Sequence, residues 1–365
     1  MSSSQPPTVP GGPGGIRVGA PDAEAEPPLS PEDAADGDIG SSKFAAAQSS
    51  EASSHFERLE LEEIDEKLYR ASPELLWRPH GARGVYGGQV LGQTLYAAAK
   101  TIKQVDKRLH SLHAYFLRAG DPDVPIIYYV NTLRDGRSFS SRLVTAKQQG
   151  KTIFMGSASF QRPEPSRLEH QHIMPDVPKP WNVPTESERY RRLAKDPRCP
   201  IPWKPVMEER ASRKNPIDMR VVCAADYFSA FGPAPADPND RPYPSYSTEP
   251  RQLVWMKCRK KLSDDPNIHR AVLAYASDMS LLSTARGEFP AIDVRMVASL
   301  DHSMWFHSEF RADEWLLFDM SSPRAGGARG FTIGKIFSID GTLVATCAQE
   351  GVMRVSKKPT QLSKL

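Results

Sequence analysis

Cysteine is scarce in this chain, and its few copies are widely scattered. The 365 residues include four cysteines with no C-x-x-C pair, namely Cys199, Cys223, Cys258 and Cys347. Structural zinc sites and disulfide-dense scaffolds both use closely spaced cysteines, so the pattern disfavours both classes. We expect free thiols in a reducing compartment.

Long apolar runs are also missing. No run approaches the roughly 20 residues that a membrane-spanning helix needs, so we expect no membrane span. The N-terminus lacks the basic-then-apolar order of a secretory signal, and it is acidic where an organellar transit peptide would be rich in Arg.

Several motifs that identify common function classes are absent. The sequence has no long Lys/Arg run, zinc finger or RNA-recognition motif, so we expect no nucleic-acid partner. The missing G-x-S-x-G nucleophile elbow weakens the case for a serine hydrolase. Residues 326–330 are rich in glycine but lack the spacing of a phosphate-binding loop, so they predict a turn. No motif requires a metal or redox cofactor.

Charge is unevenly distributed along the chain. Residues 1–50 contain two basic and seven acidic side chains, a net charge of −5, whereas the whole chain carries +3. The remainder therefore carries +8, which favours an anionic ligand.

The chain does contain an internal repeat. The segment 111–119 is repeated, with changes, at 299–312, and Gly150 and Gly341 each begin a similar strand-like stretch. This period is too long for a solenoid, so we expect two copies of one structural unit. Residues 89–102 and 269–286 predict one long helix in each copy, and residues 294–307 predict a strand.

We expect an α+β fold in which an antiparallel sheet wraps round a long helix in each copy. The predicted organisation is a disordered N-terminal extension (1–54), a first unit (55–161), a Pro-rich connector (162–215), a second unit (216–356) with an insertion near 225–250, and a C-terminal tail (357–365).

The tail ends in Ser363-Lys364-Leu365, the S-K-L signal that the peroxisomal import receptor reads. All three residues match at the required position. We therefore expect a peroxisomal matrix protein whose partners include that receptor.

The candidate site consists of polar side chains in apolar surroundings. Asp278 lies in a mostly apolar helical stretch, where an ionised carboxylate costs several kcal/mol unless it is partnered. Its structural alternative is that Ser277 and Asp278 mark a helix break and cap a second helical segment. Ser299 and Gln349 lie in strand-like stretches, where a hydroxyl or an amide often serves only to tie strands together.

Alignment of the two copies places these three positions in one copy only. Tyr96 falls opposite Asp278, Ser111 opposite Ser299, and Ala158 opposite Gln349. A polar trio that is present in only one copy of a duplicated unit suggests a catalytic site, so this pattern favours an enzyme. The adjacent Asp301 and His302 offer a competing acid–base pair, although neighbouring strand residues point to opposite faces.

Six blocks resemble the TesB-type acyl-CoA thioesterases, with the S-K-L end most similar to the peroxisomal branch of that family. The blocks are Y-G-G-Q-V-L-G-Q (86–93), H-S-L-H-A-Y-F (110–116), R-A-G-D-P (118–122), A-Y-A-S-D (274–278), S-L-D-H-S-M-W-F-H (299–307) and A-Q-E-G-V-M-R (348–354). The resemblance implies a double-hotdog fold and hydrolysis of fatty acyl-CoA to free acid and CoA. It also implies that Asp278, Ser299 and Gln349 form the catalytic trio.

Several functional alternatives remain open at this stage. Asp278 would activate a water that Ser299 and Gln349 orient, or Ser299 would itself be the nucleophile. A hotdog enoyl-CoA hydratase would instead use Asp301 and His302, and a non-catalytic acyl-CoA-binding module would need none of these residues. We also expect a homo-oligomer, because a double hotdog leaves sheet edges and faces that commonly pair.

Overall fold

The computed structural model describes residues 56–356, except 198, 200, 224–248, 288 and 290–293. The predicted N-terminal extension, the tail with Ser363-Lys364-Leu365 and most of the insertion near 225–250 lie outside the described residues. No helix among the described residues is long and apolar enough to cross a membrane.

The described strands form one antiparallel sheet of 13 strands, in which the two halves of the chain meet at the pairing of β3 with β10. Along the sheet, the first half contributes β1 (Glu62–Asp65), β2 (Leu68–Ala71), β4 (Ile126–Asp135), β5 (Phe139–Gln148), β6 (Lys151–Gln161) and β3 (Arg108–Phe116). The second half continues with β10 (Asp301–Phe306), β13 (Leu343–Val355), β12 (Arg329–Ser338), β11 (Leu316–Gly326), β8 (Arg251–Cys258) and β7 (Ile217–Cys223), while β9 (Val294–Ser299) pairs with β13.

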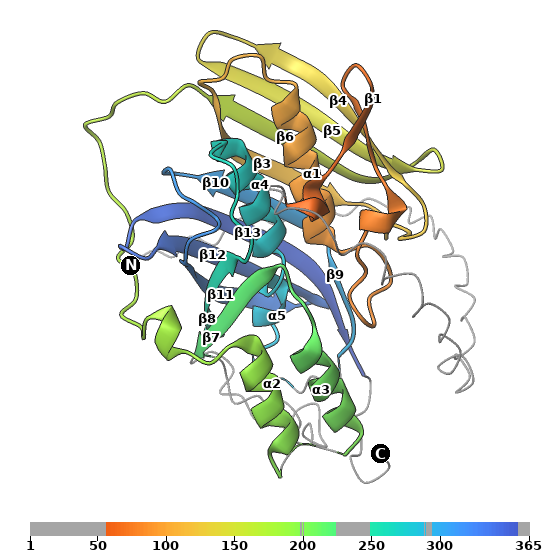
Figure 1. The fold of residues 1–365 in the computed structure, drawn as a ribbon, viewed down its shortest axis with the longest axis vertical. Coiled ribbons are helices and arrows are strands. Elements are labelled where there is room, and N and C mark those ends of the chain that lie inside the picture. The colour runs from red at the N-terminus through yellow and green to blue at the C-terminus, as the bar shows by residue number, and fades with distance from the viewer. Residues whose placement is uncertain are drawn as a thin grey trace, which may run out of the picture. The chain divides into compact units, whose positions relative to one another are not determined.

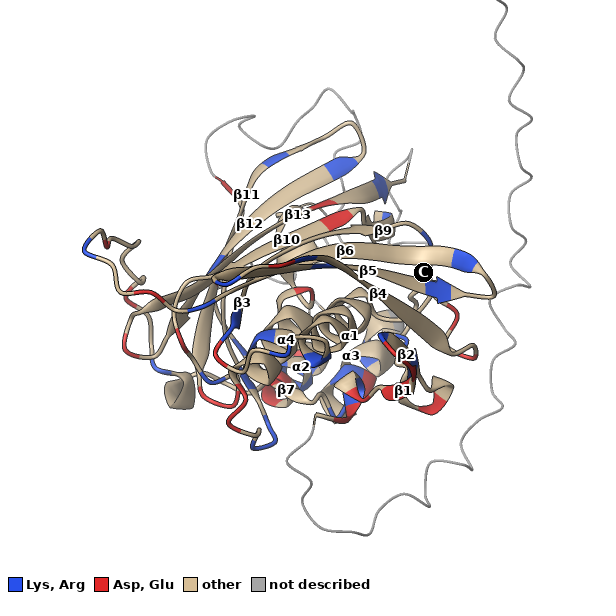
Figure 2. Ribbon diagram, turned by 90° about the horizontal axis from the view of Figure 1, so that it is seen from above, with Lys and Arg blue, Asp and Glu red and all other residues tan. Residues whose placement is uncertain are grey.

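Two central helices, α1 (Gly87–Lys100) and α4 (Pro266–Ser277), lie side by side on the concave face of the sheet (Figures 1 and 2). Glycines permit their close approach. A Cβ atom on Gly88 would lie 2.4 Å from the carbonyl oxygen of Tyr275, and one on Gly92 would lie 2.9 Å from that of Ala271. Because any larger residue would push the helices apart, the crossing depends on these two positions.

The predicted helix 269–286 is wrong in its second part. Helix α4 ends at Ser277, Asp278 follows as the C-cap residue, and a separate short helix, α5 (Leu281–Thr284), comes next. The predicted structural alternative is right about the break at Ser277 and Asp278, but neither residue caps the second helix, because the N-cap position of α5 is Ser280. Asp278 therefore lies at the end of the apolar helix α4 and not within it.

The predicted strand 294–307 is also interrupted, at Leu300. The N–H of Leu300 donates to Glu350 in β13, while its carbonyl accepts from Phe116 of the first half. The chain thus passes from β9, which pairs only with β13, into β10, which also pairs with β3. A local kink of this kind re-aims the side chains on either side of it.

The strand pairing corrects the alignment of the two halves. With Gly150 aligned on Gly341, Phe160 corresponds to Gly351; Phe160 pairs with Leu109, and Gly351 pairs with Ser299. Leu109, and not Ser111, therefore occupies the place of Ser299. Ala158 likewise occupies the place of Gln349. At both positions the first half has an apolar residue and the second half has a polar one.

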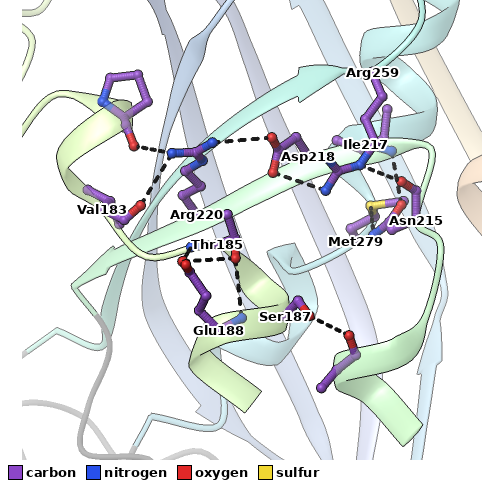
Figure 3. A network of polar contacts seen from close by, with 12 residues as sticks. Val183, Thr185, Ser187, Glu188, Asn215, Ile217, Asp218, Arg220, Arg259 and Met279 are labelled. Atoms are coloured by element: carbon purple, nitrogen blue, oxygen red, sulfur yellow. Dashed lines mark hydrogen bonds and ion pairs between the residues drawn. The ribbon is translucent and has the colours of Figure 1, made fainter. Parts of the chain in front are cut away.

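The connector is an ordered part of the fold. Its two helices, α2 (Glu186–Lys195) and α3 (Lys204–Ser212), lie close to the short helices that the sequence pattern predicts at 186–193 and 207–213. A capping box between Thr185 and Glu188 begins α2. Figure 3 shows Arg220 of β7 donating to the carbonyls of Pro180 and Val183 and pairing with Asp218. These contacts fix the connector against the second half.

Candidate active site

Asp278 lies where the apolar helix α4 stops. Loss of water around its carboxyl raises the pKa to about 6, and three hydrogen bonds work in the opposite direction, from Gln349, from the backbone N–H of Gly88 and from Ser299. A carboxyl with a pKa near neutrality is suited to take up and return a proton during a reaction.

The start of α1, from the other half of the chain, faces this carboxyl. A Cβ atom on Gly87 would lie 2.9 Å from Asp278 Oδ2, so a larger residue there would push against the carboxylate. The N-terminus of a helix carries partial positive charge and free N–H groups. Both halves therefore contribute to the candidate site.

The structure brings the three sequence-predicted site residues together. The amide Nε2 of Gln349 donates to Asp278 Oδ1 and to Ser299 Oγ, in each case at 2.7 Å. Ser299 Oγ donates to the same Asp278 oxygen at a longer 3.4 Å. Gln349 is fully buried, whereas Asp278 and Ser299 are partly buried. The result is one carboxylate held by two polar groups at the break between β9 and β10.

Asp301 and His302 take no part in this cluster. Asp301 accepts a hydrogen bond from the backbone N–H of Glu350. His302 is fully buried, and its Nε2 lies 3.1 Å from the Ser277 hydroxyl. Burial lowers the pKa of His302 to about 4. The two side chains make separate contacts on opposite faces of the strand, as their adjacency predicts.

The contact of His302 with Ser277 is one that sequence reasoning missed. The Ser277 hydroxyl already donates to the carbonyl of Ala274, so His302 Nε2 is the donor in their contact. His302 therefore ties the last turn of α4 to the sheet, one residue before Asp278. A serine beside an aspartate in an apolar helix was the only sequence signal available.

A large cleft lies beside Asp278, with a volume of about 2070 Å³. Its wall includes Met279 and Ser280, the residues that follow Asp278, and Tyr86, which precedes α1. Helices α2 and α3 of the connector form another part of the wall. The described lining contains three acidic residues and many basic ones, including Arg58, Arg78, Arg189, Arg210, Arg213, Lys214, Arg251, Arg286, Arg329 and Arg354. Such a wall attracts anions.

Comparison with known proteins agrees with this geometry. A family model described as acyl-CoA thioesterase matches residues 233–352, and one described as acyl-CoA thioesterase N-terminal domain matches residues 75–161. The chain is 40% identical to mouse acyl-coenzyme A thioesterase 8 over 305 residues, which are 83% of this chain and 89% of the relative. It is 37% identical to acyl-CoA thioesterase 2 of Haemophilus influenzae, covering 82% of this chain and 96% of the relative.

Solved structures give the same answer. The acyl-CoA thioesterase II TesB2 from Mycobacterium marinum matches with a TM-score of 0.61 and 37% identity, over 82% of this chain and 97% of the other. A protein with a hotdog fold from Alicyclobacillus acidocaldarius, only 18% identical, matches with a TM-score of 0.58 and supports the fold alone. Fold and relatives together define a double-hotdog thioester hydrolase. The chain belongs to the TesB-type acyl-CoA thioesterase family.

Proposed function

We propose that this thioesterase hydrolyses fatty acyl-CoA to free fatty acid and CoA, with Asp278, Ser299 and Gln349 as its catalytic residues. The observation that carries the proposal is the Gln349 amide, which joins a carboxylate of raised pKa to a hydroxyl next to a large basic cleft. Asp278 takes a proton from a water that Ser299 and Gln349 orient, and the water oxygen attacks the thioester carbonyl carbon. The carbon–sulfur bond then breaks, and Asp278 returns the proton to the leaving thiolate.

A direct attack by water is favoured over attack by Ser299. Gln349 donates to Ser299 Oγ, which withdraws electron density from that oxygen, and the contact between Ser299 and Asp278 is long for a proton transfer. The start of α1 supplies positive potential for the oxygen that becomes negative during the attack. Stable acyl labelling of Ser299, with a burst of product, would contradict the direct route.

Replacement of Asp278 by Asn tests the proposal. We expect release of free thiol from a panel of acyl-CoAs to fall by about 100-fold or more, because the amide cannot accept the proton.

In the wild type, kcat/KM should fall as the pH drops below about 6, where Asp278 becomes protonated. Asn removes a desolvated charge, so the variant should melt no earlier than the wild type at pH 8.

Thiol release that survives this substitution would move the chemistry elsewhere. His302→Ala, assayed for crotonyl-CoA hydration, then tests the hydratase alternative. Retention of acyl-CoA without turnover by the wild type would instead support a binding module.

We also propose that the basic cleft binds the phosphates of CoA. Arg78, Lys214 and Arg354 line it from three separate segments, and all three are exposed. CoA is highly anionic through its diphosphate and 3′-phosphate groups, and the cleft reaches Met279 and Ser280 beside the candidate catalytic carboxyl.

Reversal of one cleft charge tests this placement. Lys214→Glu should raise KM for acyl-CoA about fivefold or more, with little change in kcat, because the lost attraction affects binding alone. The same variant should hydrolyse the matching acyl-pantetheine, which lacks the nucleotide, as the wild type does. Lys151→Glu, outside the cleft, is the matched control, and equal effects of the two variants would contradict the proposal.

The terminal Ser363-Lys364-Leu365 supports a peroxisomal location. We expect a fluorescent fusion of the full chain with a free C-terminus to enter peroxisomes and the same fusion without these three residues to stay outside. Import of both forms would show that the tripeptide is not the targeting signal.

The outer face of the first half supports self-association. Tyr129, Met155 and Tyr115 lie in one row across the sheet, and Tyr115 is 59% exposed. In the second half, the connector covers the corresponding face and buries Trp255. We therefore propose that a second copy of the chain covers the first-half face. Sedimentation should give a wild-type oligomer that Tyr115→Glu dissociates; a wild-type monomer would contradict the proposal.

A further inference from the structure

Thr332 lies directly opposite Gln349, on the neighbouring strand β12. Both side chains are fully buried. Within the described residues, neither the Thr332 hydroxyl nor the Gln349 oxygen Oε1 has a hydrogen-bond partner. Residues opposite each other on an antiparallel pair have Cβ atoms only about 5 Å apart. Two buried polar atoms without partners, side by side, are unusual because each costs about 1–3 kcal/mol.

The two ends of the Gln349 amide have nearly the same shape but opposite hydrogen-bonding character. With Nε2 toward the site, the amide donates to both Asp278 and Ser299. With the amide reversed, Oε1 would face the carboxylate, two acceptors would meet, and Asp278 would lose its 2.7 Å hydrogen bond from Gln349. A donor on the far side of the amide would hold the productive orientation.

We propose that Thr332 is a positioning residue for catalysis: its hydroxyl donates to Gln349 Oε1, after a small change of rotamer or through one enclosed water, and so keeps Nε2 toward Asp278 and Ser299. This proposal rests on the proposed role of Gln349. Thr332 touches neither the water nor the thioester, and it acts only through the glutamine.

The first half of the chain supports this assignment. The strand pair that corresponds to Thr332 and Gln349 holds Arg142 opposite Ala158. Arg142 turns to Thr101 and Asp135 and makes a different, structural set of contacts. The pairing of a hydroxyl with an amide therefore occurs in the half that contains Asp278, and its counterpart in the half without a carboxylate has another purpose.

Thr332→Val removes the hydroxyl and keeps the shape of the side chain. We expect kcat to fall about tenfold with KM unchanged, and Thr332→Ser to restore most of the loss. Because the Gln349 hydrogen bond lowers the pKa of Asp278, the acid limb of the pH profile should move to higher pH in Thr332→Val. The other titratable groups that interact with Asp278, Tyr86 and Cys347, have raised pKa values and stay neutral there.

Two further variants separate this role from a general effect on the fold. Thr94→Val is the control, because Thr94 in α1 is equally buried, and its hydroxyl has no hydrogen-bond partner among the described residues; it should leave kcat and the pH profile unchanged. In a Gln349→Ala background, Thr332→Val should have no additional effect.

The outcomes distinguish the two proposals. Wild-type kcat and pH profile in Thr332→Val, beside a strongly impaired Gln349→Ala, would overturn the role of Thr332 alone. Full activity in Gln349→Ala would overturn the catalytic role of the glutamine and the role of Thr332 together. Failure of Thr332→Ser to recover activity, or an equal loss in Thr94→Val, would reduce Thr332 to a packing residue.

Discussion

The rest of the site depends on one constraint, the placement of an acidic group where water is largely excluded. Burial alone would neutralise Asp278, and the hydrogen bonds from Gln349, Gly88 and Ser299 oppose that tendency. The three donors come from β13, from the start of α1 and from β9. Their convergence requires the close crossing of α1 and α4, which the two helix glycines allow. Helix packing and the acidity of one side chain are therefore linked.

Duplication explains why the two halves differ. The first half contributes a helix start, and it has Leu109 and Ala158 where the second has Ser299 and Gln349. The second half contributes the carboxylate and its two side-chain partners, Ser299 and Gln349. Each half keeps the shared architecture, because the sheet is joined through β3 and β10 and the core extends across both.

The sequence predicted the helix-wrapped sheets, and it singled out the three polar residues that the structure brings together, because polar side chains in apolar periodic stretches are conspicuous. It misjudged the break at Asp278, because the apolar pattern continues into α5 and hides the end of α4. It equated Ser111 with Ser299 because each begins a Ser-Leu pair, whereas the strand pairing places Leu109 opposite Phe160 as it places Ser299 opposite Gly351. The sequence could not predict the cleft, because its wall combines the connector with segments that are far apart in the chain.

His302 shows how a plausible catalytic residue can have a different purpose. An imidazole that acts as a base at neutral pH needs a pKa near 7 and access to the substrate. Burial lowers the pKa of His302 to about 4, so the ring is neutral at physiological pH, and its Nε2–H is committed to Ser277. A neutral ring adds no charge beside Asp278 and can still hold the last turn of α4 in place. The histidine thus fixes the chain just before Asp278, through its contact with Ser277.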